Sequence, residues 1–323
     1  MKSIKSKEVS VLLIGPFNEP FDYLIENNIN GLDVGQIVLA PLGSRKVVGI
    51  IVSEGSKKYP IEKLKKIINV YDINPIPTSS IDLVYFLASW YCVYTGLVLK
   101  MVLSPLEAIT SPILNKIYKI NLSDYPNENS IDYKKITSKR KVILDYLSNF
   151  DEGKMIEDLI KDTGITKNII RDMLKKGFIK EELVKLESTI STDLISESIK
   201  NNQHLKILNE HQKAAIETIN VSIKNSSPDC FLLDGVPGSG KTETYFDTVQ
   251  TCLDENKQVL ILLPEIALTP DWQKRFYDRF NFNPLVWHSD ITQKKRKEIW
   301  FAALNGSAPV IVGARSALLI PIL

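Results

Sequence analysis

The sequence predicts a multi-domain α/β protein, and three observations lead to that prediction. The chain has 323 residues, a length that favours two or three domains. Residues 235–242 read Gly-Val-Pro-Gly-Ser-Gly-Lys-Thr, a phosphate-loop pattern that joins a strand to a helix. From about residue 205 onward, short β-branched runs alternate with helical patterns, which indicates a parallel sheet.

Composition excludes several classes of protein. The net charge is only +2, so a nucleic-acid surface would have to come from local clusters of basic residues. The three cysteines, Cys92, Cys230 and Cys252, follow no metal or disulfide spacing and fit a reducing compartment. No stretch approaches the ~18 apolar residues of a membrane span. We therefore expect a cytoplasmic protein with no membrane partner.

Residues 1–105 form the first predicted domain, and their pattern is mainly β. The predicted strands are Val9–Ile14, Gln36–Pro41 and Val47–Val52, with a turn at 41–44 between the last two. Beyond Pro77, apolar residues recur at helical spacing and predict one amphipathic helix that ends at Tyr94. Because an aromatic stripe on a helix is more often core than a base-stacking platform, we interpret five aromatic side chains as core: Tyr85, Phe86, Trp90, Tyr91 and Tyr94.

Residues 106–200 are predicted to form a connector followed by a small helical domain. We expect a strand at Ile113–Ile120, three helices and a final hairpin, the arrangement of a winged helix. The pattern alone fits a DNA-binding module and a protein-contact domain equally well. If the module binds DNA, its third helix carries the contacts, with Arg171 as the main candidate. The predicted helices are Lys141–Phe150, Met155–Lys161 and Thr166–Lys176; the hairpin pairs 178–180 with 183–185; the other basic candidates are Lys167, Lys175 and Lys176.

Residues 201–323 are predicted to form a parallel-sheet lobe that carries the phosphate loop. The loop follows the first expected strand, at the carboxyl edge where ligands bind in such sheets. The expected strands are Phe231–Asp234, Val259–Leu263, Leu285–Trp287 and Val310–Val312, and the expected helices are Thr242–Leu253, Asp271–Phe280 and Thr292–Leu304.

The phosphate loop predicts ATP and Mg²⁺ as cofactors. Its glycines allow successive backbone N–H groups to converge on phosphate oxygens, and the following helix adds its positive N-terminal end. Lys241 is expected to reach the β- and γ-phosphates, and the Thr242 hydroxyl is expected to hold Mg²⁺, so both are the candidate catalytic residues. The candidate phosphate-binding residues are Gly235, Gly238, Ser239, Gly240, Lys241 and Thr242.

Longer strings closely resemble the PriA-type primosomal helicases (primosomal protein N′). FLLDGVPGSGKTETY, LLPEIALTP, WHSD and VGARSALLIPI occur in the order and spacing of that family. PFDYL and VGQIVLAPLGSRKVVGIIV extend the resemblance to the N-terminus. The resemblance is weakest over residues 105–205, where the family carries a winged helix.

The resemblance implies an ATP-dependent 3′→5′ DNA helicase of replication restart, with a RecA-like first lobe. Such an enzyme recognises stalled forks and initiates primosome assembly. Gln212 would read the adenine of ATP, and Arg315 would contact the DNA backbone. The expected partners are forked DNA, 3′ DNA ends, other primosome proteins and single-stranded-DNA-binding protein.

The resemblance also implies a pocket for the 3′-terminal nucleotide of DNA in the first domain. Its residues map onto Phe21, Asp22, Gly43 and Lys65. Asp22 would accept a hydrogen bond from the free 3′-hydroxyl, and Gly43 would permit close approach of the backbone.

The sequence departs from the family pattern at its end and inside the phosphate loop. Pro237 stands where the family usually has Thr. The chain stops before the family's Walker-B carboxylates, zinc-binding cysteines and second motor lobe, so we expect an N-terminal portion, with zinc only in the missing part. Such a portion is expected to bind ATP–Mg²⁺ weakly and to hydrolyse it negligibly. The alternative is a non-catalytic module that binds forked DNA and carries a vestigial nucleotide lobe.

Overall fold

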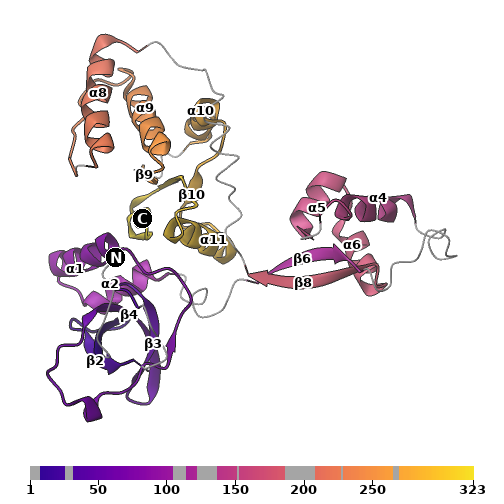
Figure 1. The fold of residues 1–323 in the computed structure, drawn as a ribbon. Helices are drawn as coiled ribbons and strands as arrows, with labels where there is room; N and C mark the ends of the chain where they lie inside the picture. Colours follow the sequence, from indigo (N-terminus) through magenta and orange to yellow (C-terminus); the bar gives the residue numbers. More distant parts are fainter. Residues whose placement is uncertain are drawn as a thin grey trace. The chain divides into compact units, whose positions relative to one another are not determined.

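The computed structural model describes residues 8–25, 32–104, 114–121, 137–150, 153–185, 208–226, 228–264 and 269–323. It divides into two compact units, Met1–Thr110 together with Ser188–Leu323, and Ser111–Glu187 (Figure 1). Within the described residues, none of the helices has the length and apolar content needed to cross a bilayer.

The N-terminal domain is built on a five-stranded antiparallel sheet in the order β2-β1-β4-β3-β5. The predicted strands are confirmed, because their alternating apolar residues fill the two faces of this sheet. The PFDYL segment contains the edge strand β2, which pairs with β1. The strands are β1 (Glu8–Leu13), β2 (Phe21–Leu24), β3 (Ile37–Leu42), β4 (Arg45–Glu54) and β5 (Asn69–Val70).

Two helices follow the sheet where the sequence predicted one. α1 (Thr78–Tyr91) ends because Cys92 adopts a left-handed conformation with φ 52°, and α2 (Thr95–Val102) then begins. Ile81, Val84 and Ala88 are the buried residues of α1. The interpretation of the aromatic side chains as core is wrong, because all five are exposed. The exposed fractions are 38% for Tyr85, 58% for Phe86, 71% for Trp90, 68% for Tyr91 and 48% for Tyr94.

One apolar cluster joins the N-terminal domain to the C-terminal lobe. It contains Val98, Leu99 and Val102 of α2 together with Trp300 and Ala303 of the C-terminal helix α11 (Gln293–Leu304). Trp300 is 1% exposed, and its indole N–H donates to the Val102 carbonyl oxygen over 2.8 Å. The two segments therefore share a core although they are separated by about two hundred residues in the sequence.

In its described residues, the unit Ser111–Glu187 combines a three-stranded antiparallel sheet, order β7-β6-β8, with three short helices. The helices lie where the sequence predicted them. The expected hairpin is wrong: residues 179–185 form one continuous strand, β8, because all of them pair with β6. The elements are β6 (Leu114–Ile120), α4 (Ser138–Leu147), β7 (Lys154–Met155), α5 (Ile156–Thr163), α6 (Lys167–Lys175) and β8 (Ile179–Lys185).

The C-terminal lobe contains a three-stranded parallel sheet, order β10-β11-β9, as the alternating pattern predicted. The expected strand Phe231–Asp234 is wrong: this segment pairs with no described strand, and Leu232 is 93% exposed. An apolar run predicts a strand only where a neighbour can take its backbone hydrogen bonds. The remaining elements are α8 (Glu210–Lys224), α9 (Lys241–Asp254), β9 (Val259–Leu262), α10 (Pro270–Phe280), β10 (Leu285–Trp287), β11 (Val310–Gly313) and the 3₁₀ turn η4 (Arg315–Leu319).

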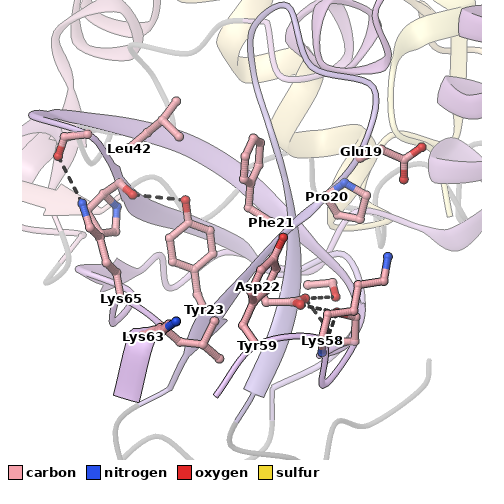
Figure 2. Close-up of a pocket in the computed structure, with 15 residues that line it drawn as sticks. Glu19, Pro20, Phe21, Asp22, Tyr23, Leu42, Lys58, Tyr59, Lys63 and Lys65 are labelled. Carbon is pink, nitrogen blue, oxygen red and sulfur yellow. Dashed lines mark hydrogen bonds between the residues drawn. The ribbon is translucent and has the colours of Figure 1, made fainter. Parts of the chain in front are cut away.

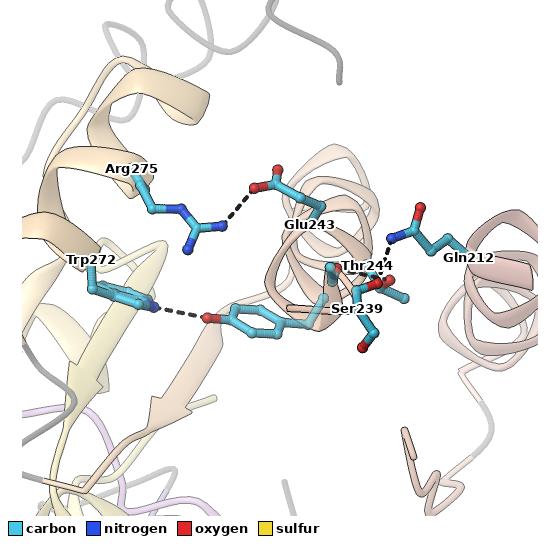
Figure 3. Close-up of polar contacts among 8 residues, drawn as sticks. Gln212, Ser239, Glu243, Thr244, Trp272 and Arg275 are labelled. Carbon is cyan, nitrogen blue, oxygen red and sulfur yellow. Dashed lines mark hydrogen bonds and ion pairs between the residues drawn. The ribbon is translucent and has the colours of Figure 1, made fainter. Parts of the chain in front are cut away.

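Contacts between α9 and α10 fix the helix that follows the phosphate loop. The Trp272 indole N–H donates to the Tyr245 hydroxyl over 2.8 Å, and Arg275 pairs with Glu243 over 2.7 Å (Figure 3). Beneath these polar contacts, the rings of Phe246 and Phe276 pack edge to face with centroids 5.7 Å apart. The first turns of α9 are thus held by both apolar packing and paired charges.

Candidate nucleic-acid interface and phosphate loop

A cavity of about 590 Å³ opens on the N-terminal domain, between β2, the β3–β4 turn and the segment 56–65 (Figure 2). All four residues predicted for the 3′-end pocket line this one cavity, although they come from three separate parts of the sequence: Phe21, Asp22, Gly43 and Lys65. The other lining residues are Ser10, Glu19, Pro20, Tyr23, Pro41, Leu42, Ser56, Lys58, Tyr59, Lys63 and Leu64.

Two aromatic side chains offer ring surface to this cavity. Phe21 is 36% exposed and is fixed edge-on by the Phe17 ring, with centroids 5.3 Å apart. Tyr59 is 60% exposed. A third aromatic side chain, Tyr23, is buried in the floor, where its hydroxyl donates to the Pro41 carbonyl oxygen over 3.1 Å. Exposed rings of this kind are suited to stacking against a nucleobase.

Asp22 is a lining carboxylate of the cavity, and its two oxygens accept hydrogen bonds from two serines. The Ser10 hydroxyl donates to Oδ1 over 2.6 Å, the Ser56 backbone N–H donates to Oδ1 over 3.2 Å, and the Ser56 hydroxyl donates to Oδ2. Partial burial raises the pKa of this carboxyl, but the hydrogen bonds from Ser10 and Ser56 and the nearby Lys58 ammonium outweigh it. The pKa of Asp22 therefore lies below its ordinary value.

Gly43 and Lys65 also line the cavity. Gly43 has φ 60°, the left-handed conformation that the tight β3–β4 turn requires. A Cβ at this position would meet no atom within 4 Å, so the turn leaves open space above it. The Lys65 ammonium donates to the Gly43 carbonyl oxygen over 3.4 Å, which keeps a positive charge beside that space.

Sequence reasoning did not identify several polar or aromatic residues of the cavity. Ser10 and Ser56 carry no motif, and only the fold brings them to Asp22. The sequence did contain a sign of three others, Lys58, Tyr59 and Lys63. Residues 57–66 hold five lysines around a Tyr-Pro pair. A basic run with an aromatic residue is a recognisable nucleic-acid pattern.

Two glycines of the phosphate loop adopt the left-handed conformation. Gly238 and Gly240 have φ 81° and 83°, and Gly240 directly precedes the first residue of α9. The Lys241 ammonium lies over the loop, where it donates to the carbonyl oxygens of Gly235 and Val236. Thr242 is half-buried in the first turn of α9. Backbone N–H groups at such a helix start are suited to phosphate.

Gln212 binds to the loop itself. Its side-chain oxygen accepts from the Asn209 N–H over 2.9 Å, which completes a capping box with Asn209 at the start of α8. Its amide nitrogen donates to the Ser239 carbonyl oxygen over 3.0 Å (Figure 3). A Cβ on Gly240 would lie 2.2 Å from that nitrogen, so only glycine allows the contact. Both the oxygen and the nitrogen of the Gln212 side-chain amide therefore form hydrogen bonds within the protein.

The remaining predicted site residues lie apart from the cavity. Arg315 is exposed at the first position of η4, just beyond the carboxyl end of β11. Residues 265–268, in the middle of the string LLPEIALTP, lie outside the described residues. Across the described ranges, no cluster of three or more His, Cys, Asp or Glu side chains is arranged to hold a metal ion. The Thr242 hydroxyl remains the predicted Mg²⁺ contact.

In the unit Ser111–Glu187, α6 carries a basic stripe. Lys167, Arg171 and Lys175 follow at intervals of four residues, so they lie on one face, and all three are exposed. Lys176 lies outside the stripe and pairs with Asp172 over 3.2 Å. The opposite face buries Ile170 and Met173.

Comparisons with known proteins match both ends of the chain. Residues 10–104 match the PriA family model described as 3′DNA-binding domain, and residues 205–320 match the model described as type III restriction enzyme, res subunit.

Proteins named Replication restart protein PriA are similar along nearly the whole chain. The Haemophilus influenzae protein is 33% identical over 97% of this chain and 42% of its own length. The Bacillus subtilis protein is 24% identical over 94% of this chain and 46% of its own length. A Rickettsia prowazekii relative is 42% identical over 39% of this chain and 18% of its own length. The chain thus spans less than half the length of these relatives. The resemblance predicted from the motif strings is confirmed: the first domain matches the PriA 3′DNA-binding domain, and nearly the whole chain is homologous to proteins named Replication restart protein PriA.

Proposed function

We propose that the cavity of the N-terminal domain binds the 3′-terminal nucleotide of a DNA strand. The observation that carries this proposal is the convergence of an aromatic ring, a hydrogen-bonded carboxylate and a lysine on one cavity: Phe21, Asp22 and Lys65. The ring stacks on the terminal base, the ammonium offsets phosphate charge, and the carboxylate accepts from the free 3′-hydroxyl. Only a chain end presents that hydroxyl, so the carboxylate distinguishes an end from continuous backbone.

A fluorescence-anisotropy titration of the whole chain tests this proposal. Two thymidine oligonucleotides of equal length are compared, one with a 3′-hydroxyl and one with a 3′-phosphate. We expect the hydroxyl end to bind about tenfold more tightly, since an unpaired buried hydrogen-bonding group costs about 1–3 kcal/mol. Equal affinities would contradict the proposal.

At the level of the whole protein, we propose an ATP-dependent 3′→5′ DNA helicase that acts in replication restart. The match to the type III restriction enzyme subunit over residues 205–320 and the relatives' printed name support it. The second candidate is a fork-binding module whose nucleotide lobe is vestigial. The contacts of the Lys241 ammonium and of the Gln212 amide within the loop favour it, because these groups would have to leave their partners to reach a nucleotide.

We expect Lys241→Ala to weaken ATP–Mg²⁺ binding by about tenfold, because a charge-assisted contact contributes about 1.5–3 kcal/mol. The measurement is a titration with a fluorescent ATP analogue in the presence of Mg²⁺. Lys213→Ala, which removes an exposed lysine next to Gln212, is the matched control and should leave the affinity unchanged. Equal loss in both variants would contradict a phosphate role for Lys241.

For the unit Ser111–Glu187, we propose a winged helix that presents α6 to duplex DNA at a fork. Arg171→Ala should weaken binding to forked DNA several-fold and reduce the slope of log K against log salt by about 0.9, since one phosphate contact is lost. The measurement is a salt series of anisotropy titrations. Lys224→Ala, at the end of α8, is the control of similar charge. An unchanged slope for Arg171→Ala would contradict the proposal.

The partners that we propose for the longer helicase are 3′ DNA ends, forked DNA, other primosome proteins and single-stranded-DNA-binding protein. The DNA partners rest on the cavity and on α6. The protein partners rest on the family relationship alone.

A further inference from the structure

Asp22 is held on both of its oxygens by donors from two different elements. Ser10 lies in β1 directly opposite Asp22 in β2, so its side chain is on the same face of the sheet. Its hydroxyl has one proton, and the 2.6 Å contact to Asp22 Oδ1 is much shorter than its 3.3 Å separation from the Glu54 carbonyl oxygen. Ser56 approaches from the loop after β4 and contacts both oxygens through its N–H and its hydroxyl.

The loop that carries Ser56 is itself fixed by a second carboxylate. Glu8 is 7% exposed, and its Oε1 accepts from the Lys57 N–H over 3.0 Å. Lys57 adopts a left-handed conformation with φ 57°, which is costly for a residue other than glycine. The Gly55 N–H also donates to the Glu8 carbonyl oxygen over 2.8 Å. The position of the Ser56 hydroxyl is therefore set by the sheet, through the loop Gly55–Lys58.

The geometry leaves one acceptor position on Asp22 for a ligand. An ionised carboxylate has about four lone-pair sites, two on each oxygen. Oδ1 accepts from Ser10 and from the Ser56 N–H, whereas Oδ2 accepts from the Ser56 hydroxyl alone. The second lone pair of Oδ2 is the one left for the cavity.

We propose that Ser10 and Ser56 are positioning residues for end recognition, which hold the Asp22 carboxylate so that Oδ2 accepts from the 3′-hydroxyl of DNA. This inference rests on the proposed function of the cavity. With donors on opposite oxygens, the carboxylate cannot rotate about its Cβ–Cγ bond. Without the two hydroxyls, only the Ser56 N–H would hold the carboxylate, at Oδ1. The ligand's hydrogen bond would then have to fix the position of Oδ2, which costs side-chain entropy on binding. Neither serine needs to touch the nucleotide.

The test compares thymidine oligonucleotides that end in a 3′-hydroxyl or in a 2′,3′-dideoxy sugar, titrated against the whole chain. For wild type we expect about a tenfold preference for the hydroxyl end. For Ser10→Ala/Ser56→Ala the preference should fall to about threefold or less, while affinity for the dideoxy end changes little. Ser56→Thr keeps the hydroxyl and should retain the preference. Ser53→Ala is the matched control, because the Ser53 hydroxyl donates to Glu54 and not to Asp22.

The pH dependence of the preference separates positioning from a merely structural role. The depressed pKa of Asp22 keeps it ionised as pH falls, so the preference is present above that pKa and is lost as pH falls through it. Removal of the two hydroxyls raises the pKa, so the double variant should lose its remaining preference at a higher pH than wild type. The charged groups around Asp22 are unchanged in that variant: Lys58, Lys63 and Lys65, with Glu8, Glu19 and Glu54. Thymine does not titrate in this range.

Three results would overturn the inference. The first is an unchanged preference and an unchanged pH profile in the double variant. The second is an equal loss of affinity for both ends, which indicates that the serines only stabilise the domain. The third is the absence of any preference in wild type, which would overturn the proposed function as well. A preference that survives in Ser53→Ala and Ser56→Thr but not in the double variant supports it.

Discussion

Trp300→Ala should destabilise the protein by about 3–5 kcal/mol, the range measured for buried large aromatic residues replaced by alanine. Trp300 is among the largest fully buried side chains of the described residues, and it packs in the cluster that α11 shares with α2. Its loss also leaves the Val102 carbonyl oxygen without the indole donor at 2.8 Å. The measurement is urea unfolding followed by circular dichroism, with the change taken from the shift of the midpoint.

Trp90→Ala is the matched control for this prediction. Trp90 is 71% exposed on α1, where it stacks on Phe86 with centroids 5.9 Å apart. Its removal should change the free energy of unfolding by about 0.5 kcal/mol or less. Trp300→Phe should lie between the two, because it keeps most of the apolar contact and loses only the hydrogen bond. A cost for Trp300→Ala no larger than that for Trp90→Ala would mean that the shared core of α2 and α11 is wrong.

Asp22→Ala should erase the preference for a 3′-hydroxyl over a 3′-phosphate while general DNA affinity is mostly retained. We expect the wild-type ratio of about ten to fall to about one, because the variant has neither the acceptor nor the charge that repels a phosphate. Asp22→Asn should give an intermediate ratio, since an amide oxygen still accepts but carries no charge. The ratio is obtained from paired anisotropy titrations of each variant.

Glu19→Gln serves as the control for Asp22, because Glu19 is the other carboxylate that lines the cavity. It is exposed at the approach to β2. Its ratio should stay at the wild-type value. If Glu19→Gln lowered the ratio as much as Asp22→Ala did, overall negative charge rather than a placed acceptor would explain the discrimination.

The sequence pattern was sufficient to predict those strands and helices that depend on a few neighbouring residues. The strands of the N-terminal sheet follow from their β-branched runs, and α11 follows from Thr292, whose hydroxyl accepts from the Lys295 N–H. The pattern failed where strand pairing or backbone conformation determines the extent of an element. Residues 179–185 form one strand because β6 accompanies them throughout, and α1 stops early because Cys92 turns left-handed. Neither fact is visible in residue types.

The candidate functional residues also include some that the sequence could predict and some that it could not. The phosphate loop is contiguous, so its glycines, Lys241 and Thr242 could be identified from eight consecutive residues. The cavity is assembled from β2, the β3–β4 turn and the segment 56–65, so only the family resemblance suggested Phe21, Asp22, Gly43 and Lys65. Ser10 and Ser56 could not be found in advance, because their role depends on a cross-strand pairing and on a loop fixed by Glu8.

The central claim is that the cavity binds a chain end, and a comparison of linear with circular DNA tests it most directly. A labelled thymidine oligonucleotide with a free 3′-hydroxyl is bound to the whole chain, and unlabelled competitors of the same length and sequence displace it. We predict that the linear competitor displaces the label at a concentration about tenfold lower than its circularised form, because only the linear strand has a 3′-hydroxyl for Asp22. Equal displacement by the linear and circular strands would contradict the account.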